Sequence, residues 1–238
     1  MGGLGGQSSG TASYSAVKEI ASDETIKDET YSSENSDENA VLATGSITAQ
    51  LSDTTITKTG DSDGGDTSNF YGNNSGITAK DGAALTLKNM KITTDTSGAN
   101  GVFSYGGSAT TSNSSGDGTS VTISNSEITT TGDNAGGIMT TGGGTMTASD
   151  LTINTSGRSS AAIRTDRGGG SVDVTGGTYT TTGIGSPSVY STTDIIVNNA
   201  RLVSKASEGI VIEGKNSVTL NDCTLTDNNT ELNGQSTT

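Results

Sequence analysis

The apolar residues of this chain recur in short alternating runs and form no helical stripe. In the stretch VTISNSEITT (residues 121–130), apolar residues occupy the first, third and eighth positions. Alternation by two is typical of short β-strands that turn one face inward and the other to solvent. The same phrase returns, altered, as MTASDLTINT (146–155) and VTLNDCTLTD (218–227). The pattern therefore predicts one strand-rich unit that is repeated along the chain.

Eight such units can be aligned on their first inward position, with steps of 25, 36, 36, 25, 26, 23 and 23 residues. These starts are Glu24, Ala49, Leu85, Val121, Met146, Val172, Ile195 and Val218. A second apolar column follows later in the units: Val41, Ile77, Val102, Ile138, Ile163, Val189 and Ile210. A period near 25 residues with two or three short strands indicates one coil of a β-solenoid. We expect an all-β parallel β-helix of about eight coils, with 23–26 residues per coil and two insertions of about eleven residues.

The fifth position of each unit predicts a sharp corner. It is occupied by Asp28, Asp53, Asn89, Asn125, Asp150, Gly176, Asn199 and Asp222. Asn, Asp and Gly tolerate the left-handed backbone conformation that a tight corner needs. This column is interpreted as structural.

The periodic pattern covers residues 14–229 and predicts a single domain. Residues 14–23 are expected to lie over the first coil as an N-terminal cap, and residues 1–13 to be disordered. Residues 230–238 form a polar tail after an open or truncated end. Unpaired strand edges at that end would favour self-association or continuation of the natural chain.

Composition narrows the class of protein. Hydrophobic residues make up 28% of the chain, against roughly 45–50% in an ordinary globular domain, and a stack of thin coils needs few of them. A net charge of −14 with only 12 Lys and Arg residues argues against nucleic-acid binding. No apolar run is long enough to insert into a membrane. The absence of His excludes Ser-His-Asp and Cys-His catalysis and His-ligated metals.

The first insertion, GDSDGGDTSNFYGNNSG (60–76), carries alternating carboxylates. Asp61, Asp63 and Asp66 in a Gly-rich loop suit Ca²⁺, which prefers several oxygen ligands. The alternative is a solvated acidic loop. The second insertion, YGGSATTSNSSGDGTS (105–120), lies one coil further on, so the two loops are expected to meet.

Aromatic residues gather in the outward columns beside the later strand. Phe103, Tyr105 and Tyr190 are predicted to point outward around Arg164, with Met139 in the same column. Exposed aromatic surface marks contact with a ligand, and aromatic rings beside Arg and Asp suit a sugar. Phe70 and Tyr71 of the first insertion would lie at the rim. The alternative is that the loop at 105–120 or the N-terminal segment covers these residues.

The motif SSAAIRTDRGGG (159–170) adds Asp166 and Arg167 beside Arg164. An Arg and a carboxylate on a coil face suit a Ca²⁺-dependent lyase of acidic polysaccharides, in which an Arg or a Lys abstracts the proton. The alternative is a surface ion pair of little energetic weight. A column of Thr residues on the first strand also suits ice binding, although Lys91, Glu127 and Arg201 interrupt the flat surface.

The phrases ITTTGDNAGGI, SSAAIRTDRGGG and EGIVIEGKNSVTLNDCTLT resemble those of right-handed parallel β-helix proteins of bacterial cell surfaces. This group includes adhesin-like proteins, autotransporter passengers and β-helix carbohydrate-binding proteins. The resemblance covers residues 14–229 and implies a right-handed helix, secreted or displayed on a bacterial surface. It implies a non-catalytic protein that binds a glycan or another surface ligand. A lyase and a self-associating stalk remain the alternatives, because the fold does not choose among them.

Overall fold

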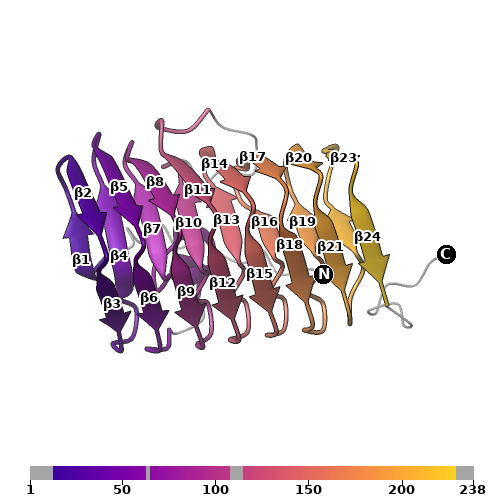
Figure 1. Ribbon diagram of the computed structural model, residues 1–238, viewed down its shortest axis with the longest axis horizontal. Coiled ribbons are helices and arrows are strands. Elements are labelled where there is room, and N and C mark those ends of the chain that lie inside the picture. Colours follow the sequence, from indigo (N-terminus) through magenta and orange to yellow (C-terminus); the bar gives the residue numbers. More distant parts are fainter. Residues whose placement is uncertain (1–12, 63–64, 108–114, 229–238) are drawn as a thin grey trace, which may run out of the picture.

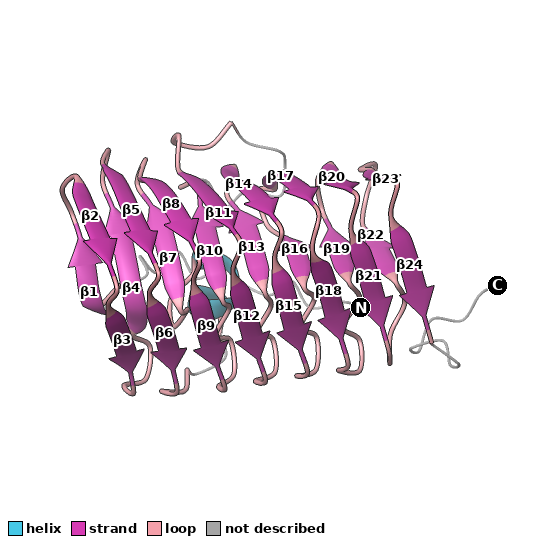
Figure 2. Ribbon diagram, viewed as in Figure 1, coloured by secondary structure: helices cyan, strands magenta, loops and turns pink. Residues whose placement is uncertain are grey.

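A computed structural model describes residues 13–62, 65–107 and 115–228 of the chain. Within these ranges, 24 short parallel strands form three eight-stranded sheets, and the chain visits the three sheets in turn (Figures 1 and 2). Each visit to all three sheets completes one coil. The protein is a right-handed parallel β-helix of eight coils, as the sequence predicts.

We name the sheets A, B and C in the order in which each coil visits them. Sheet A contains β1 (Ala16–Ile20), β4 (Asn39–Thr44), β7 (Ile77–Lys80), β10 (Val102–Tyr105), β13 (Ile138–Thr141), β16 (Ile163–Thr165), β19 (Val189–Ser191) and β22 (Ile210–Ile212). Sheet B contains β2 (Glu24–Lys27), β5 (Thr48–Ser52), β8 (Ala84–Lys88), β11 (Ser120–Ser124), β14 (Gly144–Ser149), β17 (Gly170–Thr175), β20 (Ile195–Asn198) and β23 (Val218–Asn221). Sheet C contains β3 (Thr30–Ser33), β6 (Thr55–Lys58), β9 (Lys91–Thr94), β12 (Glu127–Thr130), β15 (Thr152–Thr155), β18 (Thr178–Thr181), β21 (Arg201–Ser204) and β24 (Thr224–Asp227).

The register follows the columns that the alternating pattern predicts. Val102 of β10 lies between Ile77 of β7 and Ile138 of β13, and Val121 of β11 lies between Leu85 and Met146. Inward side chains of successive coils therefore stack like on like. They form one continuous apolar core along the axis.

The corner between sheets B and C has the predicted backbone conformation in every coil. The seven Asp and Asn residues of this column have φ between 48° and 58°, and Gly176 has φ of 70°. Neighbouring corners are also linked, since Asn89 Nδ2 donates a hydrogen bond to Asp53 Oδ1 at 2.9 Å. The column is structural.

A second, buried column closes the end of sheet C. The hydroxyls of Thr94, Thr130, Thr155 and Thr181 each donate a hydrogen bond to the carbonyl five residues later, at 2.5–2.6 Å. Lys58 occupies the same column in the second coil, because it pairs with Thr94 in register. Its side chain is fully buried, and Nζ donates to Asn35 O at 2.7 Å and to Gly60 O at 2.5 Å. Burial lowers the pKa of Lys58 to about 8.

The first coil ends the apolar core with a charged pair. Lys18 precedes Val41 in its inward column, and Glu24 precedes Ala49 in another. Lys18 Nζ lies 2.8 Å from Glu24 Oε1. Residues 16–20 form β1, which pairs with β4 as a strand of the stack. The N-terminal cap expected over residues 14–23 thus includes a strand that pairs with the stack, and its role as a cap stays a prediction.

Candidate functional site

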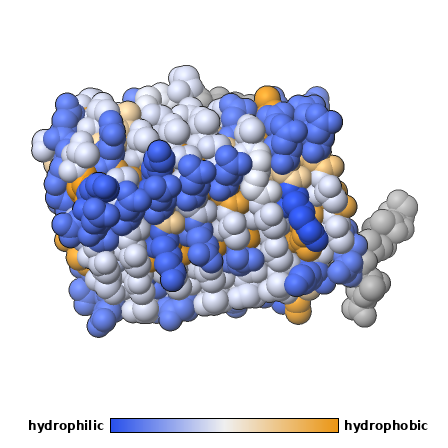
Figure 3. Space-filling view, in the orientation of Figure 1, coloured by the Kyte–Doolittle hydropathy of each residue, from blue (hydrophilic) through white to orange (hydrophobic). Residues whose placement is uncertain are grey.

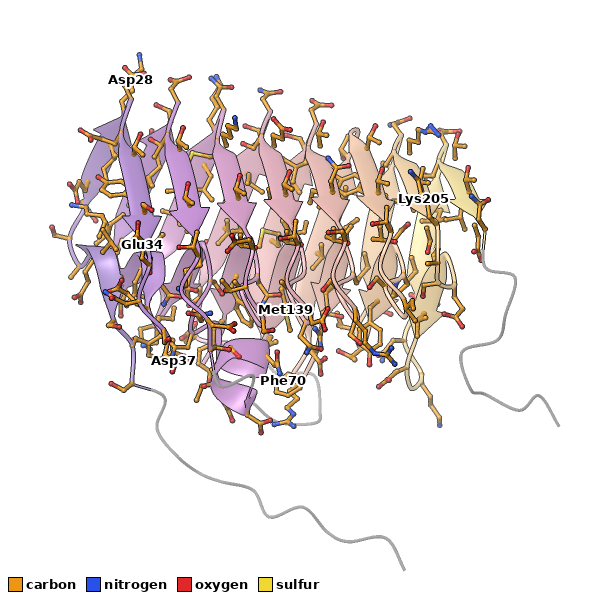
Figure 4. The ribbon with its side chains drawn as sticks, turned by 90° about the horizontal axis from the view of Figure 1, so that it is seen from below. Asp28, Glu34, Asp37, Phe70, Met139 and Lys205 are labelled. Atoms are coloured by element: carbon orange, nitrogen blue, oxygen red, sulfur yellow. The ribbon has the colours of Figure 1, made fainter. Side chains whose placement is uncertain are left out.

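The outward face of sheet A carries the candidate site, and it is divided into two halves. The first insertion forms a short helix, α1 (Asp66–Tyr71), that lies against the strands β7, β10 and β13 (Figure 4). We call the outward residues of these three strands the covered half. The outward residues of β16, β19 and β22, together with the residues that directly follow these strands, are the open half.

Two predicted contact residues are buried in the covered half. Phe103 and Met139 have no exposed surface. A Cβ atom on Gly72, at the C-terminus of α1, would lie 2.8 Å from the Phe103 ring, so helix and ring are in tight contact. The expectation that Phe103 and Met139 are exposed is therefore wrong. The first insertion covers them, whereas the sequence had suggested the second insertion or the N-terminal segment as the cover.

Backbone carbonyls at the end of α1 accept hydrogen bonds from three separate parts of the chain. Thr141 Oγ1 donates to Phe70 O at 2.8 Å, Tyr14 Oη to Tyr71 O at 2.6 Å, and Thr78 Oγ1 to Gly72 O at 2.5 Å. These carbonyls are the groups that a helix leaves without internal partners. Side chains of the sheet and of the N-terminal segment thus hold the helix on the face.

The helix ends in a left-handed glycine, and it carries both predicted rim residues, Phe70 and Tyr71. Gly72 has φ of 75° and its N–H donates to Thr67 O, which closes the C-terminus. The Tyr71 ring meets the Tyr105 ring edge to face, with centroids 5.5 Å apart. The first insertion thus contacts the last residue of β10, and the expected meeting of the two loops stays a prediction, because residues 108–114 lie outside the described ranges.

Arg167 joins the helix to the open half. Its Nη1 lies 2.6 Å from Asp66 Oδ2, and its guanidinium lies 3.9 Å from the centre of the Phe70 ring. An anionic Asp in the first turn of a helix also interacts favourably with the helix dipole. Arg167 therefore marks the boundary between the two halves.

The predicted calcium ligands have other partners. Asp61 Oδ1 accepts hydrogen bonds from the N–H groups of Ser62 and Ser97, at 3.2 and 3.0 Å. Asp66 pairs with Arg167, and Asp63 lies outside the described residues. Within the described ranges, no group of three or more acidic or Cys side chains is placed to hold a metal. Calcium binding stays a prediction.

The open half carries a continuous chain of polar contacts across three coils. Arg164 Nη2 donates to Asp166 Oδ2 at 2.8 Å, and the Arg164 guanidinium lies 5.6 Å from the centre of the Tyr190 ring. Tyr190 Oη donates to Glu213 Oε1 at 2.5 Å. Burial and the hydrogen bond to Glu213 raise the pKa of Tyr190. The Tyr190 ring is thus fixed by a cation at its face and by a carboxylate at its hydroxyl.

Two cavities flank this chain of contacts. The arginine cavity, of about 280 Å³, is lined by Arg164, Tyr190, Pro187, Asn134 and Ser159, with Ala161 and Gly185. The carboxylate cavity, of about 300 Å³, is lined by Asp166, Glu213, Arg167, Thr192 and Asn216, with Gly168, Gly169 and Gly214. The first lies where the chain enters the strands of sheet A, and the second where it leaves them. The two cavities are therefore at opposite ends of these strands, with Tyr190 between them.

The sequence prediction missed Glu213 and the residues of the preceding corner, Asn134, Ser159 and Pro187. Glu213 follows β22 at the position that Asp166 holds after β16, so the column itself was the available signal.

A larger depression of about 610 Å³ runs along the corner between sheets B and C, lined by Asn89, Asn125 and Asp150 among others. We assign it to the surface of the structural corner column. The face seen in Figure 3, over sheets B and C, mixes hydrophilic and neutral side chains with scattered hydrophobic ones.

Among the described residues, no helix is long and apolar enough to cross a membrane. Comparison with models of protein families, with curated proteins and with solved structures gave no match.

Proposed function

We propose that this protein binds a glycan through the open half of sheet A, as a non-catalytic, adhesin-like protein that is secreted or displayed on a bacterial surface. The observation that carries the proposal is the placement of Tyr190. Its ring is partly exposed, is fixed by Arg164 on one side and Glu213 on the other, and separates two cavities. A fixed aromatic ring beside polar groups offers a stacking surface and hydrogen bonds to a sugar at low entropic cost.

The rigid backbone supports this function. Neighbouring coils lie about 4.8 Å apart, and each strand of the open half is paired on both sides or belongs to the last coil. Contact residues on such a frame keep their spacing when the ligand arrives. Binding therefore needs little ordering of the protein.

The test is a glycan-array screen of the wild-type chain, run with Ca²⁺ and with EDTA, followed by titration of any bound glycan against variants. We expect Tyr190→Ala to weaken binding at least tenfold. Tyr105→Ala, in the covered half, serves as the matched aromatic control and should retain binding. If no glycan binds, or if Tyr190→Ala binds as well as wild type, the proposal fails. Loss of binding in EDTA alone would assign a role to Asp61, Asp63 and Asp66.

A second candidate, a self-associating stalk, is favoured by the last coil. The inward columns that begin with Lys18 and Glu24 end with Ile210 and Val218. In that coil Ile212 and Leu225 are 45% and 43% exposed. Light scattering over a range of concentrations tests this function, and a constant monomer mass would argue against it.

The lyase and ice-binding hypotheses have less support on this surface. Arg164, the residue that a lyase would need as its base, is held by Asp166 at 2.8 Å and lies over the Tyr190 ring. An exposed Thr column is also an ordinary property of strand surfaces.

A further inference from the structure

We infer that the glycan carries a carboxylate, and that this acidic sugar occupies the arginine cavity while a neutral sugar occupies the carboxylate cavity. The inference rests on the proposed function of the same surface. It names the class of ligand as a polysaccharide in which a uronate alternates with a neutral sugar.

The first observation is an incomplete set of hydrogen bonds at Arg164. The side chain is only 13% exposed, and its Nη2 is taken by Asp166. Among the described residues, Nη1 is buried and meets no acceptor. Buried donors in native proteins almost always have partners, and an unpaired N–H of a charged group is costly. A ligand oxygen in the adjoining cavity would supply the missing acceptor.

The chemistry of that acceptor follows from the charge around it. Asp166 already receives two hydrogen bonds, one from Arg164 and one, at 2.9 Å, from the backbone N–H of Arg167. The guanidinium of Arg167 is paired with Asp66, so Arg164 is the cation beside Asp166 that has a donor to offer. Guanidinium groups form their strongest hydrogen bonds with carboxylates, since donor and acceptor are both charged. A carboxylate is therefore the acceptor that best pairs with the unfilled Nη1 donor of Arg164.

The wall of the arginine cavity fits a single sugar ring. Asn134 and Ser159 supply polar groups for hydroxyls, Pro187 supplies an apolar surface, and Tyr190 supplies an aromatic face. Nη1 is shielded from solvent in the unliganded protein. Arg164 lines the cavity, so this inference requires its guanidinium to turn toward the ligand before a sugar carboxylate can reach Nη1.

The carboxylate cavity favours a neutral sugar over an acidic one. Asp166 and Glu213 both line it, and within the described ranges one carboxylate oxygen of Glu213, Oε1, accepts a hydrogen bond, from Tyr190. The other oxygen accepts a hydrogen bond from a sugar hydroxyl, whereas a second sugar carboxylate would be repelled by two carboxylates. An alternating acidic and neutral chain therefore fits better than a chain of acidic sugars alone.

The positions of the cavities also set the direction of the ligand. They lie at the two ends of the strands β16, β19 and β22, so the glycan crosses sheet A parallel to the strands. Helix α1 and the Asp66–Arg167 pair border this path on the side of the first coils.

The experiment compares three oligosaccharides of equal length by isothermal titration calorimetry. One alternates a uronate with a neutral N-acetylhexosamine, the second is the same chain with its carboxylates reduced to alcohols, and the third is a homopolymer of uronates. For the wild type we expect the first to bind at least tenfold more tightly than either of the others. Arg164→Gln should bind the first two equally, and Glu213→Gln should gain affinity for the homopolymer.

Arg201→Gln is the matched control, because it removes the same charge from an exposed position on sheet C. It should keep the wild-type order of affinities. Equal binding of the acidic and reduced chains by the wild type would overturn this inference and leave glycan binding intact. Absence of binding to all three chains would overturn the inference together with the proposed surface.

Discussion

The two halves of the outward face of sheet A are built on the same strands and have opposite surroundings. In the covered half, Phe103 and Met139 lie beneath α1 with no exposed surface. In the open half, the equivalent positions of later coils hold Arg164 and Tyr190, which pair with each other and with carboxylates. Adjacent apolar residues in an outward column thus indicate a cover, whereas a cation next to an aromatic ring indicates a surface that solvent or a ligand reaches.

The largest effect that separates the two halves is expected for Phe103→Ala. Removing a fully buried ring should lower the free energy of unfolding by about 3 kcal/mol, at the low end of the range for such losses, because α1 can settle partly into the space. Tyr190→Ala in the open half should change it by less than about 1 kcal/mol. Denaturant unfolding of both variants measures the difference. Equal losses would mean that the two halves are packed alike.

Gly72→Ala should have the next largest effect. A left-handed residue with a side chain costs about 1–2 kcal/mol, and here the added Cβ would also meet the Phe103 ring at 2.8 Å. Gly45→Ala is the control, since Gly45 has φ of 88° and open space where a Cβ would be. Thermal melts of the two variants isolate the contact with Phe103. A Gly45 variant as unstable as the Gly72 variant would show that backbone strain alone is responsible.

Lys58 offers a pH test, because its Nζ holds Gly60 O, where the insertion that forms α1 begins. Its pKa of about 8 lies below the usual value of 10.5, so the unfolded chain binds more protons than the folded protein between these values. Stability should therefore rise from pH 8 toward pH 9.5, by up to about 1.4 kcal/mol per pH unit. Lys58→Thr, which restores the residue of the neighbouring coils, should lack this rise. Denaturant unfolding of the wild type and of Lys58→Thr at pH 7.5 and 9.5 measures this difference. An equal change in the free energy of unfolding of both proteins would contradict the prediction.

The smallest effect is expected for Arg167→Gln at the boundary of the two halves. The Arg167 and Asp66 side chains are 40% and 56% exposed, so their pair should contribute no more than about 1 kcal/mol and should weaken in salt. Hydrogen exchange of the α1 amides should nevertheless rise, because one of the contacts that hold the helix is lost. Unchanged exchange would show that the carbonyl contacts hold the helix alone.

The sequence predicted the coils well because each coil obeys local rules. Inward alternation fixes the strands, and the Asp, Asn or Gly at each corner fixes the turn, so Asn89 or Asp150 could be placed without knowing the rest of the chain. The position of α1 depends instead on contacts between distant segments, such as Thr141 with Phe70 and Tyr14 with Tyr71. Those contacts leave no periodic signal.

Lys58 shows a different limit of the pattern. A lysine in a polar strand position is normally interpreted as exposed, and nothing in its immediate neighbours contradicts this. Its alignment with Thr94, Thr130, Thr155 and Thr181 was the available clue, since every member of that column is buried and bonded to a carbonyl.

For the open half, the sequence brought together Arg164, Asp166 and Tyr190 but missed Glu213, which completes the row of contacts from the last coil.

The Lys18–Glu24 pair gives the β-helix a polarity that matters for protein engineering. A coil designed to precede β1 would have to bury this ion pair against apolar side chains, which costs more in desolvation than the pair returns. A coil designed to follow β24 would instead meet Ile210 and Val218, which continue the same columns as apolar residues. The two faces of the stack therefore differ in what a designed coil would pack against: a charged pair before β1 and apolar side chains after β24.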